Sequence, residues 1–214
     1  MDRQTRHLYL KRKSEAYFDS VALNNEQISE PALCYGYVLD LLRDAPGGTL
    51  ADIGCGTGEM LQRILGEFGD HFRLLGLDLS SESLKKAALL CGDRVTFTKG
   101  DVEALPYPDG SVDVLLCMHS FHHYPHPRLA LREMHRALAP GGRLILVENL
   151  HPPLRRIRKN LRLVLRRHPF GDLWMYSASA LEYLVRRAGF RVHAHFPIAD
   201  HSQLLDCRKS EDSP

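Results

Sequence analysis

Three aspartates that lie at the ends of short apolar runs are candidates for binding a polar small molecule. They are Asp52, Asp78 and Asp101, whose carboxylates accept hydrogen bonds from hydroxyl and amino groups. Asp78 lies about twenty residues beyond a glycine-rich turn, where an acidic side chain binds the ribose of a nucleotide-like ligand. Each aspartate alone is also explained as the cap of a helix or turn. Their recurrence at three successive predicted strand ends favours a shared binding edge.

The glycine-rich turn has the spacing Gly-x-Gly-x-Gly and consists of Gly54, Gly56 and Gly58. A dinucleotide-binding fingerprint would place its third glycine where this chain has Glu59. The acidic residues on both flanks, Asp52 and Glu59, disfavour a bare pyrophosphate, which needs amide donors and positive charge. The turn therefore suits a ligand that carries an amino group or a sulfonium, and a purely structural tight turn is the alternative.

Short apolar runs separated by helical patterns must position these residues. The first five runs are Leu50–Ile53, Leu74–Leu77, Val95–Thr98, Asp113–Cys117 and Gly141–Glu148. Two further runs, 190–196 and 201–207, are joined by a connection too short for a helical crossover, which predicts an antiparallel pair. We expect an α/β fold with a Rossmann-like, doubly wound, seven-stranded sheet that is mostly parallel and whose last strand pair is antiparallel.

Local signals predict where two of the helices begin. Ser80 or Ser81 is expected to cap the helix that follows the second run. Ser179 with Glu182 matches a capping box at the start of the helix before the sixth run. A short helix over residues 16–20 is expected to close over the bound ligand.

Four stretches resemble successive motifs of the class I S-adenosylmethionine-dependent methyltransferases. They are LADIGCGTGE, LLGLDLS, TKGDVEALPYPDGSVDVLLCMHSFHHYPHP and LREMHRALAPGGRLILVE. The similarity is to the methyltransferase type 11 group, which includes enzymes like those of ubiquinone and menaquinone biosynthesis. It covers residues 47–149 well and extends loosely to about residue 207. The resemblance implies an enzyme that uses S-adenosyl-L-methionine, releases S-adenosyl-L-homocysteine and methylates a small-molecule acceptor, for example a lipophilic or quinone-like ring.

The resemblance also implies where the cofactor binds. The glycine turn and the aspartate before it take the methionine end, the second strand end takes the ribose, and the third strand end takes the adenine. The end of the fourth strand runs along the cofactor, and an N-terminal tyrosine covers the methionine end. The candidate cofactor-binding residues are Asp52, Gly54, Cys55 (through its backbone), Gly56, Asp78, Leu79, Asp101, Val102, Cys117, Met118 and Tyr17.

A histidine-rich segment follows the fourth run and is expected to face the methyl donor. His122 and His123, ahead of His119, are the candidate catalytic residues, because imidazole has a pKa near neutrality and suits a base or an orienting group. Glu148, at the end of the fifth run, is a candidate on the acceptor side. Histidines that only order the loop are an alternative. A zinc site that also uses His126 is disfavoured, because no predicted helix carries an i, i+4 histidine pair and no cysteine pattern accompanies it, so no metal site is predicted.

Residues 154–169, LRRIRKNLRLVLRRHP, are basic and amphipathic. They are interpreted as a lid over the acceptor with an apolar underside and a solvated basic face. Contact with anionic lipid or a lipid-like acceptor through Arg155–Arg167 is the second interpretation. Nucleic acid is disfavoured because no RNA-binding module or stacking platform accompanies the charge. The predicted organisation is an N-terminal helical cap (1–46), a methyltransferase domain (47–208) with this lid-like insertion at about 152–176, and a flexible tail (209–214).

Composition is that of an ordinary globular chain, with 44% apolar residues, 25% charged residues and a net charge of +2. Five scattered cysteines without a Cys-x-x-Cys pair indicate reduced thiols. We therefore expect a cytoplasmic protein, without a secretory signal or a membrane-spanning segment.

Three other functions compete with the methyltransferase prediction. They are a non-catalytic cofactor-binding regulator or scaffold, an RNA methyltransferase and a nicotinamide dehydrogenase. Glu59 and the short chain disfavour the dehydrogenase. Monomer and homodimer are both compatible with the sequence.

Overall fold

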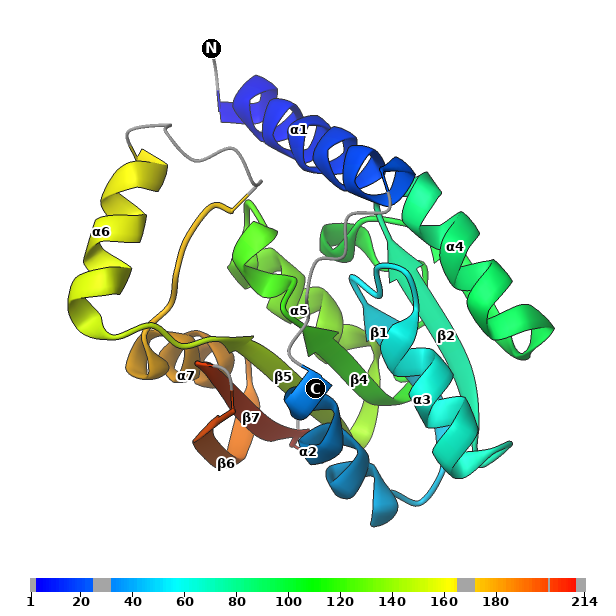
Figure 1. The fold of residues 1–214 in the computed structure, drawn as a ribbon. Helices are drawn as coiled ribbons and strands as arrows, with labels where there is room; N and C mark the ends of the chain where they lie inside the picture. The colour runs from blue at the N-terminus through cyan, green and yellow to red at the C-terminus, as the bar shows by residue number, and fades with distance from the viewer. Residues whose placement is uncertain (1–2, 25–31, 165–171, 200, 211–214) are drawn as a thin grey trace.

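The apolar runs expected to be strands form one sheet in the computed structural model, which describes residues 3–24, 32–164, 172–199 and 201–210. Within those residues the strands are β1 (Gly48–Ile53), β2 (Phe72–Asp78), β3 (Val95–Lys99), β4 (Val112–Met118), β5 (Leu138–Asn149), β6 (Phe190–Ile198) and β7 (Ser202–Lys209). Their order in space is β3-β2-β1-β4-β5-β7-β6, and only the pairs that include β7 are antiparallel (Figure 1). The predicted fold class is therefore confirmed.

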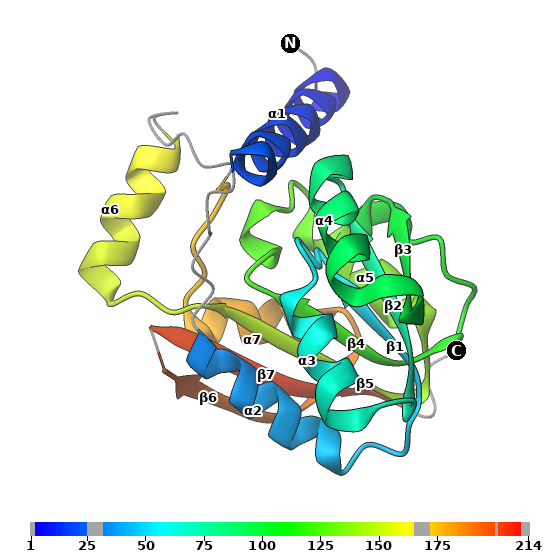
Figure 2. The same ribbon diagram turned by 45° about the vertical axis from the view of Figure 1, so that its right-hand side comes forward.

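Helices cover both faces of the sheet, which explains why the central strands are apolar at nearly every position. The side chains of Leu50, Ala51 and Leu115 are fully buried although neighbouring residues point to opposite faces. One face packs against α2 (Ala32–Arg43), α3 (Glu59–Phe68) and α4 (Ser81–Cys91), and the other packs against α5 (Pro127–Ala137) and α7 (Ala178–Arg187) (Figure 2).

Several predicted boundaries differ from the structure. Helix α7 is capped by Ser177, whose hydroxyl accepts a hydrogen bond from the Ala180 backbone N–H at 3.1 Å, so the capping box at Ser179 is wrong. Strand β5 begins at Leu138 rather than Gly141, because Leu138 already pairs with Val112. Lys209 was expected in the tail but ends β7, while residues 211–214 lie outside the described part. Ser80 caps α4 as predicted, accepting from Ser83 N–H at 3.0 Å.

Helix α1 (Arg3–Leu23) is much longer than the short helix expected over residues 16–20. Asp19 accepts a hydrogen bond from the hydroxyl of Ser80, after β2, at 2.6 Å. Lys11 forms an ion pair with Asp101, after β3, and the Phe18 ring lies 4.9 Å from the ring of His123, after β4. Helix α1 therefore crosses the edge of the sheet where these three parallel strands end (Figures 1 and 2).

Helix α6 (Pro153–Val164) has the opposite orientation from the one expected for a lid with an apolar underside. Asn160 faces the body and exchanges two hydrogen bonds with the Met175 backbone, at 2.8 and 3.0 Å. The apolar residues point outward instead, with Leu154 78%, Ile157 59% and Leu161 57% exposed. The expectation about the underside is therefore wrong, and residues 165–169 of the basic segment lie outside the described residues. None of the helices in the described part of the chain is long and apolar enough to cross a bilayer.

Candidate functional site

The three candidate aspartates lie at the ends of three adjacent parallel strands. Asp52 is the penultimate residue of β1, Asp78 is the last residue of β2, and Asp101 follows the end of β3. Because β1, β2 and β3 are neighbours in the sheet, these residues lie along the same edge. Helix α1 lies over that edge. The three carboxylates therefore share one edge of the sheet, as the sequence predicted, and the structure adds a helix above that edge.

The glycine turn between β1 and α3 is held against the end of β2. The backbone N–H groups of Gly54 and Cys55 both donate to the Leu77 carbonyl oxygen, at 2.7 and 3.1 Å. Gly54 has a φ of +75°, and a Cβ at this position would lie 2.6 Å from the Cβ of Ser120. Gly56 has a φ of +53°, but no described atom lies within 4 Å of where its Cβ would be. Open space therefore adjoins the backbone of Gly56, as a closely approaching ligand requires.

Asp78 holds the turn and the start of α4 in place with its two oxygens. Its Oδ2 accepts from the Gly56 N–H at 2.9 Å, and its Oδ1 accepts from the Ser80 N–H at 2.8 Å. Burial raises the pKa of Asp78, and these backbone donors partly offset the effect. Burial together with the charges of Asp78 and Asp52 raises the pKa of the Cys55 thiol, which keeps it neutral. A negative potential therefore surrounds the turn, and this suits a cationic ligand.

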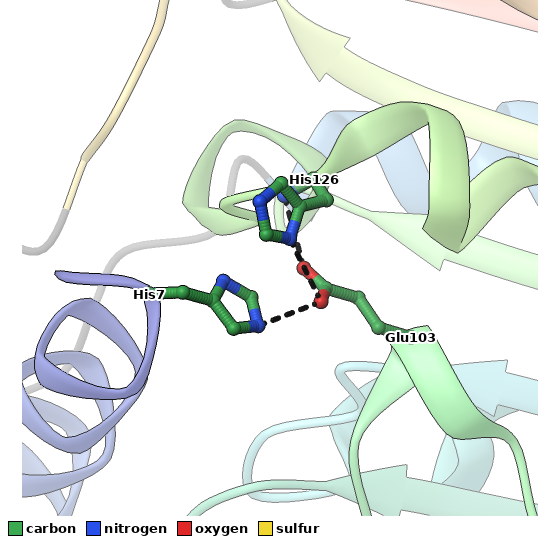
Figure 3. Close-up of side chains that lie close together, drawn as sticks. All are labelled: His7, Glu103 and His126. Carbon is green, nitrogen blue, oxygen red and sulfur yellow. Dashed lines mark hydrogen bonds and ion pairs between the residues drawn. The ribbon is translucent and has the colours of Figure 1, made fainter. Parts of the chain in front are cut away.

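The acid after β3 is already engaged by α1. Asp101 Oδ1 accepts from the Glu103 N–H at 3.0 Å, which starts a short helical turn at Val102, while its other oxygen pairs with Lys11. The next acid, Glu103, contacts His7, Lys11 and His126, and Figure 3 shows the two imidazole rings directed toward its carboxylate. These contacts fasten α1 to the strand end.

The other predicted cofactor contacts differ in how their side chains are placed. Cys117 and Met118 are buried in the core on opposite faces of β4, so only their backbone can line a bound ligand. Val102 is buried and Leu79 is half-buried. Tyr17 is half-buried on α1, with its ring 5.2 Å from that of Phe18.

His122 is buried between two carboxylates. Its Nδ1 lies 2.7 Å from Glu148 Oε1, and its backbone N–H donates to Glu148 Oε2 at 2.8 Å. Its Nε2 lies 3.5 Å from Asp172 Oδ1. Burial alone would lower the pKa of His122, but the two carboxylates outweigh burial and raise the pKa to about 10. His122 therefore carries a proton at neutral pH in this arrangement, which fits an orienting role better than a base.

The other two histidines have different surroundings. His119 has a φ of +48°, and burial lowers its pKa, so its imidazole is neutral. Its Nε2 atom is buried and has no hydrogen-bond partner among the described residues. His123 Nδ1 lies 3.6 Å from Asp172 Oδ1. A neutral imidazole with a buried, unpartnered ring nitrogen can accept a proton, so His119 suits the role of a base.

Sequence reasoning missed several residues of this region. Asp172 reaches His122 from beyond α6, and His7 and Lys11 reach Glu103 from the first turns of the chain. No local pattern marks these residues, because their partners are distant in sequence. Ser120 and Tyr124 were also missed, and their hydroxyl groups lie 2.8 Å apart beside the Ile53 carbonyl oxygen at the end of β1.

The sequence is similar to those of known methyltransferases. Residues 51–146 match the family model described as a methyltransferase domain. The chain is 29% identical over 185 residues to a demethylmenaquinone methyltransferase of Lactococcus lactis, an alignment that covers 74% of this chain and 73% of that protein. It is 37% identical over 112 residues to the 27-O-demethylrifamycin SV methyltransferase of Amycolatopsis mediterranei, covering 50% of this chain but only 40% of that one. The chain thus spans well under two thirds of the second relative.

A solved structure has the same fold. An S-adenosylmethionine-dependent methyltransferase from Aquifex aeolicus superposes with a TM-score of 0.69 at 20% identity, over 89% of this chain and 97% of that one. At this level of identity the similarity establishes the architecture.

Proposed function

We propose that this chain is a class I S-adenosylmethionine-dependent methyltransferase that methylates a small lipophilic acceptor of the quinol kind. The match of residues 51–146 to a methyltransferase domain and the sheet topology support the proposal. The observation that carries the proposal is the row of carboxylates along the ends of β1, β2 and β3, beside a glycine turn with open space at Gly56. The acceptor class is supported by the demethylmenaquinone methyltransferase among the relatives.

S-adenosylmethionine supplies a methyl group that its sulfonium already activates, so the chain's contribution is mainly binding and alignment. Asp78 accepts hydrogen bonds from the ribose hydroxyls. Asp101, with Val102 and Leu79, holds the adenine. Asp52 and the backbone of the turn at Gly54, Cys55 and Gly56 take the methionine end, where the negative potential favours a cationic group. The strand end at Cys117 and Met118 contributes backbone, and Tyr17 covers the site from α1.

On the acceptor side, His122 and His123 orient the acceptor, and Glu148 holds the ring of His122. The neutral imidazole of His119 removes a proton from an acceptor hydroxyl or carbon where the reaction requires it. Residues 1–46 act as the cap of the site, and the insertion at about 152–176 adjoins it through Asp172. A cytoplasmic location is proposed with this function and is supported by the buried thiols of the five cysteines.

Titration with S-adenosylhomocysteine tests the proposal. We expect saturable binding with a Kd on the order of micromolar by isothermal titration calorimetry, as is usual for enzyme ligands. Mass spectrometry should then detect one added methyl group on a demethylated quinol presented in detergent. Absence of binding would refute the proposal. Binding without transfer to quinols or other small molecules would favour a scaffold, and transfer to RNA would favour the RNA-modifying alternative.

We also propose that α6 contacts anionic lipid and brings the enzyme to a lipophilic acceptor. Its exposed apolar stripe (Leu154, Ile157 and Leu161) lies beside the exposed basic side chains of Arg155, Arg158 and Arg162. A helix with this combination lies in a membrane interface, its apolar residues in the acyl boundary and its arginines near the phosphates. In both views α6 lies to one side of the sheet, so a flat surface can approach it (Figures 1 and 2).

Vesicle sedimentation measures this contact. Exchanging Arg155, Arg158 and Arg162 for glutamate should weaken binding to phosphatidylglycerol vesicles by about 100-fold or more, since each basic residue near an anionic surface contributes about 1 kcal/mol. Arg187→Glu on α7, an exposed arginine of another helix, is the control and should bind like the wild type. Equal binding to neutral and anionic vesicles would contradict the electrostatic part of the proposal.

A further inference from the structure

Two clusters in the described part of the chain bring two histidines and one carboxylate within reach of a single ion. One consists of His7, Glu103 and His126, and the other of His122, His123 and Asp172. Although each has the composition of a metal site, their internal distances and charges differ. The difference decides which of them suits a cation.

The first cluster is closed by hydrogen bonds (Figure 3). Glu103 Oε2 lies 3.0 Å from His7 Nε2 and 3.3 Å from His126 Nδ1, and Glu103 Oε1 accepts from the His126 backbone N–H at 2.9 Å. The ammonium group of Lys11 lies 2.8 Å from the same Oε2 atom. A metal ion would either displace this ammonium group or be repelled by its positive charge. The first cluster therefore holds α1 in place and does not suit a metal ion.

The second cluster has the spacing of a coordination sphere. Asp172 Oδ1 lies 3.5 Å from His122 Nε2 and 3.6 Å from His123 Nδ1, which is longer than a good hydrogen bond. Two ligand atoms bound tetrahedrally to zinc at about 2.1 Å are separated by about 3.4 Å. The three candidate ligand atoms all lie within 4.8 Å of one another. The two separations that include Asp172 therefore match those around one zinc-sized ion.

The surroundings hold the first of these ligands in the orientation that a metal needs. His122 directs Nδ1 to Glu148 Oε1 at 2.7 Å, which leaves Nε2 directed toward Asp172. Metal-binding histidines usually donate their second ring N–H to a carboxylate in this way, which sets the tautomer and makes the ligand more basic. The backbone also fixes the distance between the segments, because the Leu173 N–H donates to the His122 carbonyl oxygen at 2.9 Å.

Charge is compatible with a divalent ion. Asp172 and Glu148 supply two negative charges next to two imidazoles. Lys159 on α6 is close enough to Asp172 for electrostatic interaction, but its ammonium group lies 2.8 Å from His151 Nε2. The side chains that would bind the ion are largely buried, with exposed fractions of 7%, 12% and 13% for His122, His123 and Asp172.

We propose that His122 Nε2, His123 Nδ1 and Asp172 Oδ1 bind a divalent ion of the zinc type. The ion replaces the Nε2 proton of His122, which is released to solvent, and Glu148 keeps its hydrogen bond to Nδ1 of the same ring. Three protein ligands leave the fourth tetrahedral position for water or for an oxygen of the acceptor. The ion would therefore hold a phenolic or enolic oxygen next to the methyl donor and lower its pKa. Metal binding itself does not depend on the proposed methyl transfer.

Cobalt titration of metal-stripped protein tests the site, because tetrahedral Co²⁺ has intense visible absorption and replaces zinc. We expect one site in the wild type. Asp172→Asn and His123→Gln should weaken Co²⁺ and Zn²⁺ binding by about 100-fold or more. Glu148→Gln should weaken it by about 10- to 100-fold, the usual loss of metal affinity when the hydrogen-bond partner of a metal-binding histidine is removed. His126→Gln, from the first cluster, is the matched control and should bind like the wild type.

S-adenosylhomocysteine binding, measured on the same samples, shows that each variant is folded and tests the cofactor site separately. The proposal is overturned if the wild type binds no ion or binds it without tetrahedral absorption. It is equally overturned if Asp172→Asn and His126→Gln lose the same affinity. Loss of S-adenosylhomocysteine binding with intact cobalt binding would instead count against the proposed function.

Discussion

Gly56→Ala is expected to abolish S-adenosylhomocysteine binding while leaving the fold largely intact. The residue has a φ of +53°, so alanine would cost about 1–2 kcal/mol of backbone strain. No described atom lies within 4 Å of the new Cβ, so the protein itself accommodates the methyl group. We propose that the methionine end of the cofactor occupies the same space, which the new methyl group would fill. Calorimetry for binding and urea unfolding for stability measure the two effects separately.

Two other glycines serve as controls for this prediction. Gly66→Ala, inside α3, also meets nothing within 4 Å and should stabilise the helix by about 0.5–1 kcal/mol without changing binding. Gly54→Ala should instead impair folding, because its Cβ would lie 2.6 Å from Ser120 Cβ in a buried region. If Gly56→Ala binds the ligand as tightly as the wild type, the cofactor does not approach this turn.

Asp78→Asn is expected to weaken S-adenosylhomocysteine binding by about 10- to 100-fold. A charge-assisted hydrogen bond contributes about 1.5–3 kcal/mol, and asparagine keeps an acceptor oxygen but loses the charge. The substitution also removes an internal bond, because both Asp78 oxygens accept backbone N–H groups and the new amide NH₂ would face one of these donors. A stability loss of about 1–3 kcal/mol should accompany the loss of affinity.

Asp113→Asn separates the two effects of Asp78→Asn. Asp113 Oδ2 accepts from the Thr49 N–H at 2.7 Å, so this carboxylate also holds the backbone of β1, but at the opposite edge of the sheet. We expect a comparable loss of stability in urea and unchanged ligand affinity. Equal losses of affinity in the two variants would mean that the affinity falls because the fold is destabilised, and that Asp78 does not contact the ribose.

The basic helix shows why a hydrophobic pattern does not by itself orient an element. Leu154, Ile157 and Leu161 have the spacing of a buried stripe, and the sequence favoured a buried underside. In the structure the hydrogen bonds of Asn160 to the Met175 backbone determine which face meets the body. A partner residue distant in sequence decided the orientation, and the helix pattern contained no information about it.

The sequence by itself determined the strands and the edge of the sheet at which the candidate binding residues lie. Short stretches of sequence are enough to recognise a strand, a glycine turn or the end of a strand, because each depends on residues close together in the chain. The strands, the turn and the positions of Asp52, Asp78 and Asp101 could therefore be predicted. A parallel sheet then brings its carboxyl ends to one edge without further information. The sequence therefore predicted that the three acids lie along one edge of the sheet, as the structure shows.

Only the tertiary structure decided which distant side chains meet. Asp172 lies beside His122 and His123, where the neighbouring Leu173 N–H donates to the His122 carbonyl oxygen. Lys11 reaches Asp101 from α1, which lies over the sheet edge. These pairings depend on the paths of long connections and on packing between elements. Such paths are selected by the free energy of the whole fold, so no short stretch of sequence specifies them.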